Sequence, residues 1–224
     1  MKNILITGVS GQDGSFLVNK LKVKYPNANI YGATRDPEKI KKNLLYLNKN
    51  IDLTSLNLVN LNMELFNDVD KFLNDIKPDI VFNLTGPSSV YESLKEPKKI
   101  KSQITNIFEN LTNSLIQSNN FCNFFQASSS EMYGNSTNTI FDEDSKFKPN
   151  SPYAEAKLIN HEKSIEYAKT FEWNICSGIM FNHESEFRSN DYLFTKIISA
   201  ALNLKNNKQA KLSLGSLDYV RDWK

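Results

Sequence analysis

The chain has 224 residues, of which 40% are hydrophobic and 23% are charged, and its formal net charge is +2 at pH 7. This composition is typical of a soluble globular protein with enough residues for one sizeable core. The small net charge, with lysines scattered among Asn and Asp, argues against nucleic acid as the main partner, because phosphate binding needs a clustered basic face.

The sequence has no pattern typical of a metal site, a signal peptide or a membrane span. Its two cysteines, Cys122 and Cys176, lie far apart in apolar segments and are predicted to be small core residues. Its two histidines form no cluster with metal-ligand spacing. A strand-like segment follows Met1 almost at once, and no apolar run approaches the length of a membrane span. We therefore expect a cytoplasmic protein.

Strand-like and helix-like segments alternate along most of the chain. Apolar and β-branched runs predict strands at residues 2–8, 29–35, 56–62, 78–86, 121–129 and 173–182. Helical periodicity and start signals predict helices at residues 12–25, 36–49, 66–77, 98–118 and 151–171. Asp36 and Ser151 are the expected N-caps, each followed by a proline. Alternating elements with long crossovers predict an α/β fold with a doubly wound parallel sheet, a Rossmann fold. After about residue 180 the alternation weakens to a helix around residues 191–205 and a short strand at residues 210–215.

A glycine-rich turn joins the first predicted strand to the first predicted helix. Gly8, Gly11 and Gly14 have the spacing G-x-x-G-x-x-G. Such glycines allow a sharp turn, a close approach of the backbone to a pyrophosphate and close packing of helix on strand. The N-terminus of the helix adds N–H donors for phosphates. This context predicts a dinucleotide site.

The end of the second strand bears on the choice of dinucleotide. An acidic residue at this place would hydrogen-bond the ribose of NAD, whereas an arginine would accept the 2′-phosphate of NADP. The segment offers both Arg35 and Asp36. Asp36 is better explained as the N-cap before Pro37, so the sequence favours NADP, with NAD as the alternative.

A serine run and a Y-x-x-x-K motif follow the fifth predicted strand. The stretch SSSEMYG, residues 128–134, places Glu131 directly after a buried-looking strand. Tyr153 and Lys157 lie one helical turn apart, and a nearby ammonium would lower the pKa of a phenol and make it a usable base. The spacing alone is weak, because Tyr91–Lys95 and Tyr192–Lys196 also match and are interpreted as accidental.

With these motifs the chain resembles the extended short-chain dehydrogenases/reductases, the NAD-dependent epimerase/dehydratase family, and within them the GDP-mannose 4,6-dehydratases. The resemblance is carried by the segments TGVSGQDGSFL, KPDIVFNLTGPSSV, FQASSSEMYG, SPYAEAKL, GIMFNHES and RDW. A lone Glu131 after the serines is the pattern of the GDP-mannose branch. Related epimerases have no Glu there, and dehydratases acting on dTDP- or UDP-glucose have an Asp-Glu pair.

The resemblance implies a sugar-nucleotide 4,6-dehydratase acting on GDP-mannose or a related nucleotide hexose. Tyr153 would deprotonate the 4-hydroxyl, Ser129 would hydrogen-bond it, and Lys157 would hold the nicotinamide ribose and stabilise the phenolate. Glu131 would then take the C5 proton and assist loss of the C6 hydroxyl as water, provided that burial raises its pKa. The implied cofactor-binding residues are Gly8, Ser10, Gly11, Gln12, Asp13, Gly14, Arg35, Asn62, Met63, Leu84, Lys157, His183 and Arg188. On the residues alone, His183 could equally be a structural histidine.

Three positions depart from the family pattern. Asn62 stands where the family usually has an Asp near the adenine. The asparagine side chain keeps a hydrogen-bond acceptor and adds donors. The usual Ser-His-Val after the fourth strand is Ser88-Ser89-Val90, which puts one contact at the nicotinamide or substrate in doubt. Ser129 replaces the usual Thr and keeps its hydroxyl.

Members of the family continue well beyond the position that matches Lys224. We therefore expect a dinucleotide-binding domain at residues 1–180 and a partial sugar-nucleotide lobe at residues 181–224. The expected partners are a nucleotide sugar and further copies of the chain, with no nucleic acid and no membrane. Two alternatives stay open: an epimerase or reductase of the same superfamily, and a non-catalytic NADP-binding module.

Overall fold

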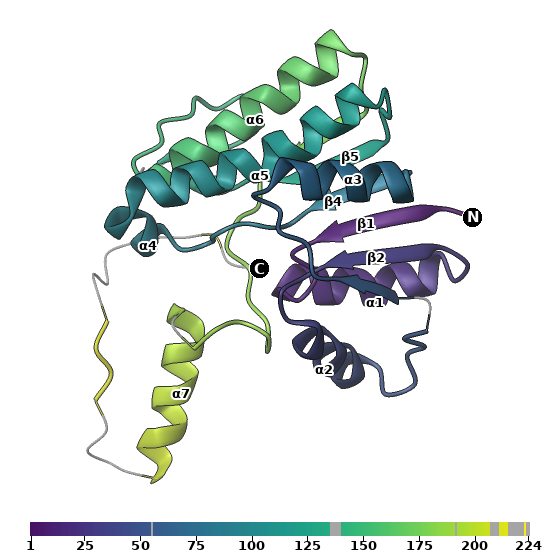
Figure 1. The fold of residues 1–224 in the computed structure, drawn as a ribbon. Coiled ribbons are helices and arrows are strands. Elements are labelled where there is room, and N and C mark those ends of the chain that lie inside the picture. Colours follow the sequence, from purple (N-terminus) through teal and green to yellow (C-terminus); the bar gives the residue numbers. More distant parts are fainter. Residues whose placement is uncertain (55, 135–139, 191, 207–210, 215–221, 223–224) are drawn as a thin grey trace.

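Six parallel strands form the centre of the computed structural model, and helices cover both faces of the sheet (Figure 1). The structure describes all residues except 55, 135–139, 191, 207–210, 215–221 and 223–224. The strands are β1 (Asn3–Thr7), β2 (Asn29–Ala33), β3 (Leu56–Val59), β4 (Ile80–Asn83), β5 (Asn123–Ala127) and β6 (Ile175–Gly178). Their order is β3-β2-β1-β4-β5-β6, with every pairing parallel. The predicted doubly wound sheet is confirmed.

The helices lie in two layers, one on each face of the sheet (Figure 1). One layer consists of α1 (Gln12–Lys24) and α2 (Pro37–Leu47), and the other of α3 (Phe66–Ile76), α5 (Pro97–Gln117) and α6 (Pro152–Thr170). Successive side chains of β1 enter different cores: Ile4 and Ile6 pack with α1 and α2, whereas Leu5 packs with Phe108 of α5. Because both faces are covered, the strands direct apolar side chains to both sides of the sheet.

Two predicted N-caps are present. The Asp36 carboxylate accepts a hydrogen bond from the Lys39 N–H at 3.0 Å, and the Ser151 hydroxyl accepts one from the Ala154 N–H at 3.1 Å. The Asp36 side chain is therefore engaged at the start of α2, and the Ser151 cap fixes the first turn of α6, which carries Tyr153.

The structure differs from the predicted elements in three places. A short helix, α4 (Val90–Lys95), precedes α5, because the Ser89 hydroxyl caps it and Pro97 starts a new helix two residues after it ends. Residues 211–214 have no regular structure, so the predicted strand is absent there, while residues 210 and 215 lie outside the described residues. Cys176, predicted in the core, is exposed because it lies on the edge strand β6.

The last described helix, α7 (Leu193–Asn206), lies apart from the sheet (Figure 1). Several of its apolar side chains are exposed, among them Phe194, Ile198 and Leu202. No helix in the described part of the chain is long and apolar enough to cross a membrane.

Candidate functional site

A chain of buried polar side chains links the carboxyl ends of β1, β4 and β5. The Thr7 hydroxyl donates to Asn83 Oδ1 at 2.7 Å, and Asn83 Nδ2 donates to Gln126 Oε1 at 2.7 Å. Gln126 Nε2 in turn donates to the Ala127 carbonyl at 2.9 Å. The chain holds three strand ends in register at the edge where doubly wound folds bind ligands.

The glycine turn packs so closely against its neighbours that its glycines have no room for a larger side chain. Gly8 has a φ of +66°, and a Cβ there would lie 2.9 Å from the Leu84 carbonyl oxygen. A Cβ on Gly14 would lie 2.6 Å from the Cα of Val9. The turn therefore packs tightly against the backbone that follows β4 and against Val9 in the turn itself, which leaves its backbone at the carboxyl edge of the sheet.

The turn also binds the segment that follows β6. Gln12 Nε2 donates to the His183 carbonyl at 3.2 Å, and His183 Nε2 lies 2.9 Å from Asp13 Oδ1. The other ring nitrogen of His183 lies 2.7 Å from the Phe181 carbonyl oxygen. Both ring nitrogens thus face acceptors, and the hydrogen bond with Asp13 is the main cause that raises the pKa of His183.

The ion pair between Asp13 and His183 should make the free energy of unfolding depend on pH. Because the pKa of His183 is raised above its ordinary value of 6.5, the stabilising contribution is complete below that pH and is lost as pH rises through the folded-state pKa. Between about pH 5.5 and 8.5, the advantage of the native chain over Asp13→Asn in free energy of unfolding should shrink by about 0.5 kcal/mol.

Urea unfolding of both proteins across this range measures the difference. His161, whose pKa is lowered by burial, is present in both proteins, so its opposite pH dependence cancels. An advantage that stays constant or grows with pH would contradict the prediction.

Tyr153, on the first turn of α6, is buried with 8% of its surface exposed. Burial raises the pKa of its phenol to about 12. A hydrogen bond with Ser129 and the charge of Arg188 lower this pKa, while Glu131 and Tyr192 raise it. Ser129 and Glu131 therefore both lie within electrostatic range of the Tyr153 phenol.

Lys157 lies one turn further along α6, with Nζ 5.7 Å from the ring centroid of Tyr153. Its ammonium is buried and donates to the Ala127 carbonyl at 2.9 Å, and burial lowers the pKa of Lys157 to about 8. The expectation that the pKa of Tyr153 is lowered is wrong for this structure, because burial of the phenol outweighs its favourable neighbours.

Glu131 lies in a single 3-10 turn, Ser130–Tyr133, directly after β5. Its backbone N–H donates to the Ser129 hydroxyl at 3.2 Å, and its side chain is half-buried. The turn is anchored by Met132 and Tyr133, which are both buried. Glu131 is therefore held on the same strand end as Ser129, within range of the Tyr153 phenol.

Other predicted cofactor residues lie around the turn and the ends of β2, β3 and β4. The Ser10 hydroxyl accepts from Thr34, the Arg35 side chain is exposed, and Leu84 is half-buried. Asn62 Oδ1 accepts from the Glu64 N–H at 3.1 Å, so this amide shapes its own turn. Met63 is buried in the core on the α3 and α5 side, so its side chain has a packing role in this structure.

Tyr192 is at the site although its Y-x-x-x-K spacing was interpreted as accidental. Its hydroxyl lies 2.7 Å from the Ser88 hydroxyl, and the Arg188 guanidinium lies 3.7 Å from its ring centroid. The spacing to Lys196 gives no indication of this place, since neither contact involves that lysine. Only the fold shows that Tyr192 adjoins the loop after β4.

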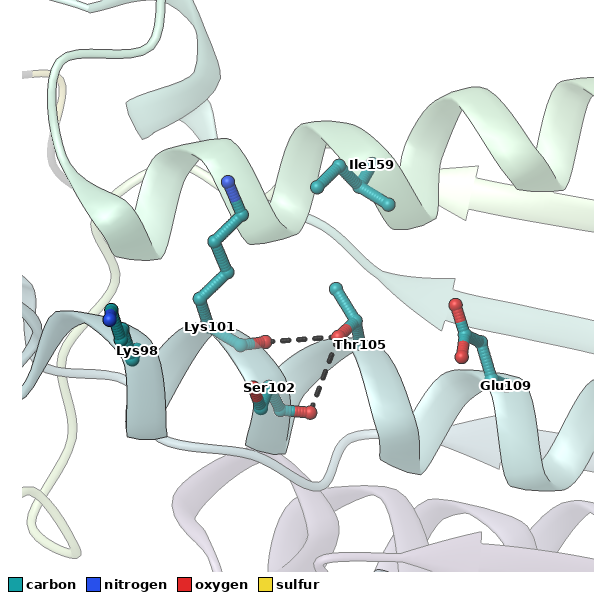
Figure 2. Close-up of a pocket in the computed structure, with 6 residues that line it drawn as sticks. All are labelled: Lys98, Lys101, Ser102, Thr105, Glu109 and Ile159. Atoms are coloured by element: carbon teal, nitrogen blue, oxygen red, sulfur yellow. Dashed lines mark hydrogen bonds between the residues drawn. The ribbon is translucent and has the colours of Figure 1, made fainter.

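A shallow groove of about 430 Å³ lies between α5 and α6 (Figure 2). It is lined by Lys98, Lys101, Ser102, Thr105, Glu109 and Ile159. It contains none of the predicted site residues. Among the residues that the structure describes, no three His, Cys, Asp or Glu side chains gather to hold a metal ion.

Comparison with known proteins gives one family. A family model described as GDP-mannose 4,6 dehydratase matches residues 5–224. GDP-mannose 4,6 dehydratase 2 of Arabidopsis thaliana is 32% identical over 99% of this chain and 61% of its own length. A GDP-mannose 4,6-dehydratase of Vibrio cholerae is 31% identical over 99% of this chain and 60% of its own length. The chain therefore spans about three fifths of these relatives.

Solved structures match the fold over most of the chain. A UDP-N-acetylglucosamine 4-epimerase from Methanobrevibacter ruminantium M1 superposes with a TM-score of 0.77 at 25% identity, covering 90% of this chain and 63% of its own. A dTDP-glucose 4,6-dehydratase from Bacillus anthracis in complex with NAD gives a TM-score of 0.80 at 19% identity, covering 100% and 67%. At such identities the second likeness concerns the fold alone.

Proposed function

The chain belongs to the GDP-mannose 4,6-dehydratase family, as its motifs indicate, and we propose that it converts GDP-mannose to the 4-keto-6-deoxy sugar nucleotide. The observation that carries the proposal is the convergence of Ser129, Glu131 and Tyr153 at the end of β5, with Lys157 beside them. A hydroxyl, a carboxylate and a phenol at one place can handle two separate proton transfers, which dehydration needs and simple ketone reduction does not.

The residues present fit a dinucleotide. Gln12 Oε1 and Thr85 Oγ1 are buried without a hydrogen-bond partner in the described part of the chain, and both lie beside the glycine turn. Such atoms suit polar groups of a ligand. The residues proposed to hold it are Gly8, Ser10, Gly11, Gln12, Asp13, Gly14, Arg35, Asn62, Met63, Leu84, Lys157, His183 and Arg188. When bound, a nicotinamide ring supplies a hydride acceptor and donor.

Tyr153 is proposed to take the proton from the 4-hydroxyl of the sugar as C4 is oxidised. The Ser129 hydroxyl, whose hydrogen bonding lowers the pKa of the phenol, would hold the same sugar oxygen. Lys157 would keep a positive charge near the phenolate, since a pKa of about 8 leaves most of its ammonium protonated at neutral pH. The buried setting excludes water from this transfer.

Glu131 is proposed to carry out the elimination. The 4-ketone makes the C5 proton acidic. Glu131 would accept that proton while the electron pair of the C5–H bond forms the C5–C6 double bond. The C6 hydroxyl leaves, taking a proton back from the Glu131 carboxyl, so that one water is released and Glu131 is regenerated. Addition of a hydride at C6 and of a proton at C5, which balances the proton removed by Tyr153, then leaves the sugar with no net oxidation or reduction.

NADP is the proposed dinucleotide, with Arg35 as its 2′-phosphate ligand. The Asp36 carboxylate caps α2, which supports Arg35 as the residue free to meet the ribose. Arg35→Gln should weaken binding of NADP by about tenfold and leave that of NAD unchanged, because a charge-assisted bond to the phosphate is lost. Isothermal titration calorimetry with both dinucleotides measures this, and Lys39→Gln, which removes another exposed positive charge from the first turn of α2, is the control. Equal losses for NADP and NAD would contradict the assignment.

Residues 181–224 are proposed to form part of the sugar-nucleotide lobe, next to a dinucleotide-binding domain at residues 1–180. The segment after β6 already contacts the glycine turn through His183 and the first helices through Phe187, whose ring lies 5.4 Å from that of Phe16. The chain is also proposed to form homo-oligomers, which light scattering of the purified protein would test.

The activity is tested by incubating the purified chain and NADP with GDP-mannose and with other sugar nucleotides. A product lighter by one water, detected by mass spectrometry, supports dehydration. A product of unchanged mass but altered configuration supports an epimerase instead. Dinucleotide binding without any product would support a non-catalytic binding module and overturn the proposed reaction.

A further inference from the structure

We propose that Tyr192 is a positioning residue, which holds the Arg188 guanidinium in place for dinucleotide binding and joins the segment after β6 to the loop after β4. The proposal rests on the dinucleotide site described above, but it does not depend on the reaction carried out there. It concerns two contacts of one side chain, a ring contact and a hydroxyl contact.

The ring contact restrains Arg188. Its guanidinium carbon lies 3.7 Å from the Tyr192 ring centroid, well within the range of a cation–π interaction. The Arg188 side chain is only 23% exposed, so little water competes with the ring for the cation. Such contacts strengthen when the cation is desolvated.

The nearest carboxylate does not fix the guanidinium in the same way. Glu184 Oε2 lies 3.6 Å from Arg188 Nε, which is too long for a hydrogen bond. Both atoms are buried without a hydrogen-bond partner among the described residues. The pair neutralises charge but leaves the Arg188 Nε–H without an acceptor in the described part of the chain, so the contact with the Tyr192 ring is what restrains the position of the guanidinium.

The hydroxyl contact joins two loops that are distant in sequence. Tyr192 Oη lies 2.7 Å from Ser88 Oγ, across 104 positions of the chain. Ser88 directly precedes Ser89, the N-cap of α4, so its backbone is fixed by that helix. The Tyr192 N–H donates to the Ser189 carbonyl at 3.2 Å, which ties the tyrosine to the same turn as Arg188.

The loop after β4 and the segment after β6 both lie near Tyr153. Arg188 lowers the pKa of Tyr153 and Tyr192 raises it, so both side chains lie within electrostatic range of the Tyr153 phenol. A tyrosine at 192 serves both contacts at once. Phenylalanine would keep the ring contact with Arg188 and lose the bond to Ser88, and leucine would lose both.

The test compares dissociation constants of NADP⁺ and NAD⁺ for the native chain, Tyr192→Phe, Tyr192→Leu and Ser88→Ala by calorimetry. Tyr192→Leu should raise the dissociation constant of the dinucleotide that the native chain binds by about tenfold, because the cation–π contact and the hydroxyl contact are both lost. Tyr192→Phe should weaken it by about threefold. Ser88→Ala should match Tyr192→Phe, and the double variant should add nothing, since both remove the same bond.

Tyr91→Leu is the matched control. Tyr91 has the same Y-x-x-x-K spacing and the same type of contact, with the Lys95 ammonium 4.3 Å from its ring, but it is 66% exposed on α4. This variant should bind the dinucleotide as the native chain does. Equal affinity of Tyr192→Leu and Tyr91→Leu would overturn the proposal.

Melting temperatures separate positioning from a purely structural role. A lower melting temperature with unchanged dinucleotide affinity in Tyr192→Leu would refute a positioning role, as would a failure of phenylalanine to restore affinity over leucine. If the native chain binds dinucleotide but yields no dehydrated sugar, only the proposed reaction fails. If it binds neither dinucleotide, the Tyr192 proposal fails with it.

Discussion

Replacement of Glu131 by glutamine is expected to slow water elimination by about 10²–10⁴-fold while leaving dinucleotide affinity unchanged. Glutamine has the same shape and keeps the backbone bond from residue 131 to the Ser129 hydroxyl, so the turn after β5 should persist. Its amide cannot accept the C5 proton or return one to the departing hydroxyl. The chemical step is therefore lost without loss of the site's architecture.

The rate is measured as formation of the product lighter by one water, and proton removal as exchange of the C5 hydrogen in heavy water. Glu155→Gln is the matched control, since Glu155 lies on α6 near Tyr153 but is exposed and paired with Lys101 at 2.8 Å. If Glu131→Gln eliminated water at the native rate, the carboxylate would have no part in the reaction. A loss of dinucleotide affinity would instead indicate a disturbed fold.

Local signals in the sequence predict the sheet and the starts of α2 and α6, although they do not predict α4. Asp36 and Ser151, each followed by proline, cap the helices they predict, because capping depends on residues only three positions apart. The alternation of elements indicates a parallel sheet, since each crossover is long enough for parallel pairing. Parallel pairing then places the glycine turn and the serine run on the same edge without any further information.

Contacts between distant segments could not be predicted in the same way. Asp13 and His183 are 170 positions apart, and nothing in either segment specifies an ion pair. Tyr192 resembled an accidental match because its partner is Ser88 and not Lys196. The pKa of Tyr153 was predicted in the wrong direction, because the extent of burial depends on tertiary packing.

Tyr153→Phe is expected to lower overall conversion by about 10³-fold, with little effect on folding. Phenylalanine keeps the buried ring against Ile100, Ile104 and Ala156 but removes the oxygen that accepts the 4-hydroxyl proton. Tyr167→Phe is the control, because this tyrosine lies on the same helix and stacks on Phe108 in the core. Conversion at the native rate in Tyr153→Phe would exclude the phenol as the base.

A chemically prepared 4-keto hexose nucleotide separates the two proton transfers. Its C5 proton is already acidic, so the step assigned to Tyr153 is bypassed and only the carboxylate is needed. In heavy water, Tyr153→Phe should exchange the C5 hydrogen of this compound at close to the native rate, whereas Glu131→Gln should not. If both variants failed to exchange, one residue could not be credited with each step. If both exchanged, solvent or another group would remove the C5 proton. The assignment of this step to the Glu131 carboxylate would then be wrong.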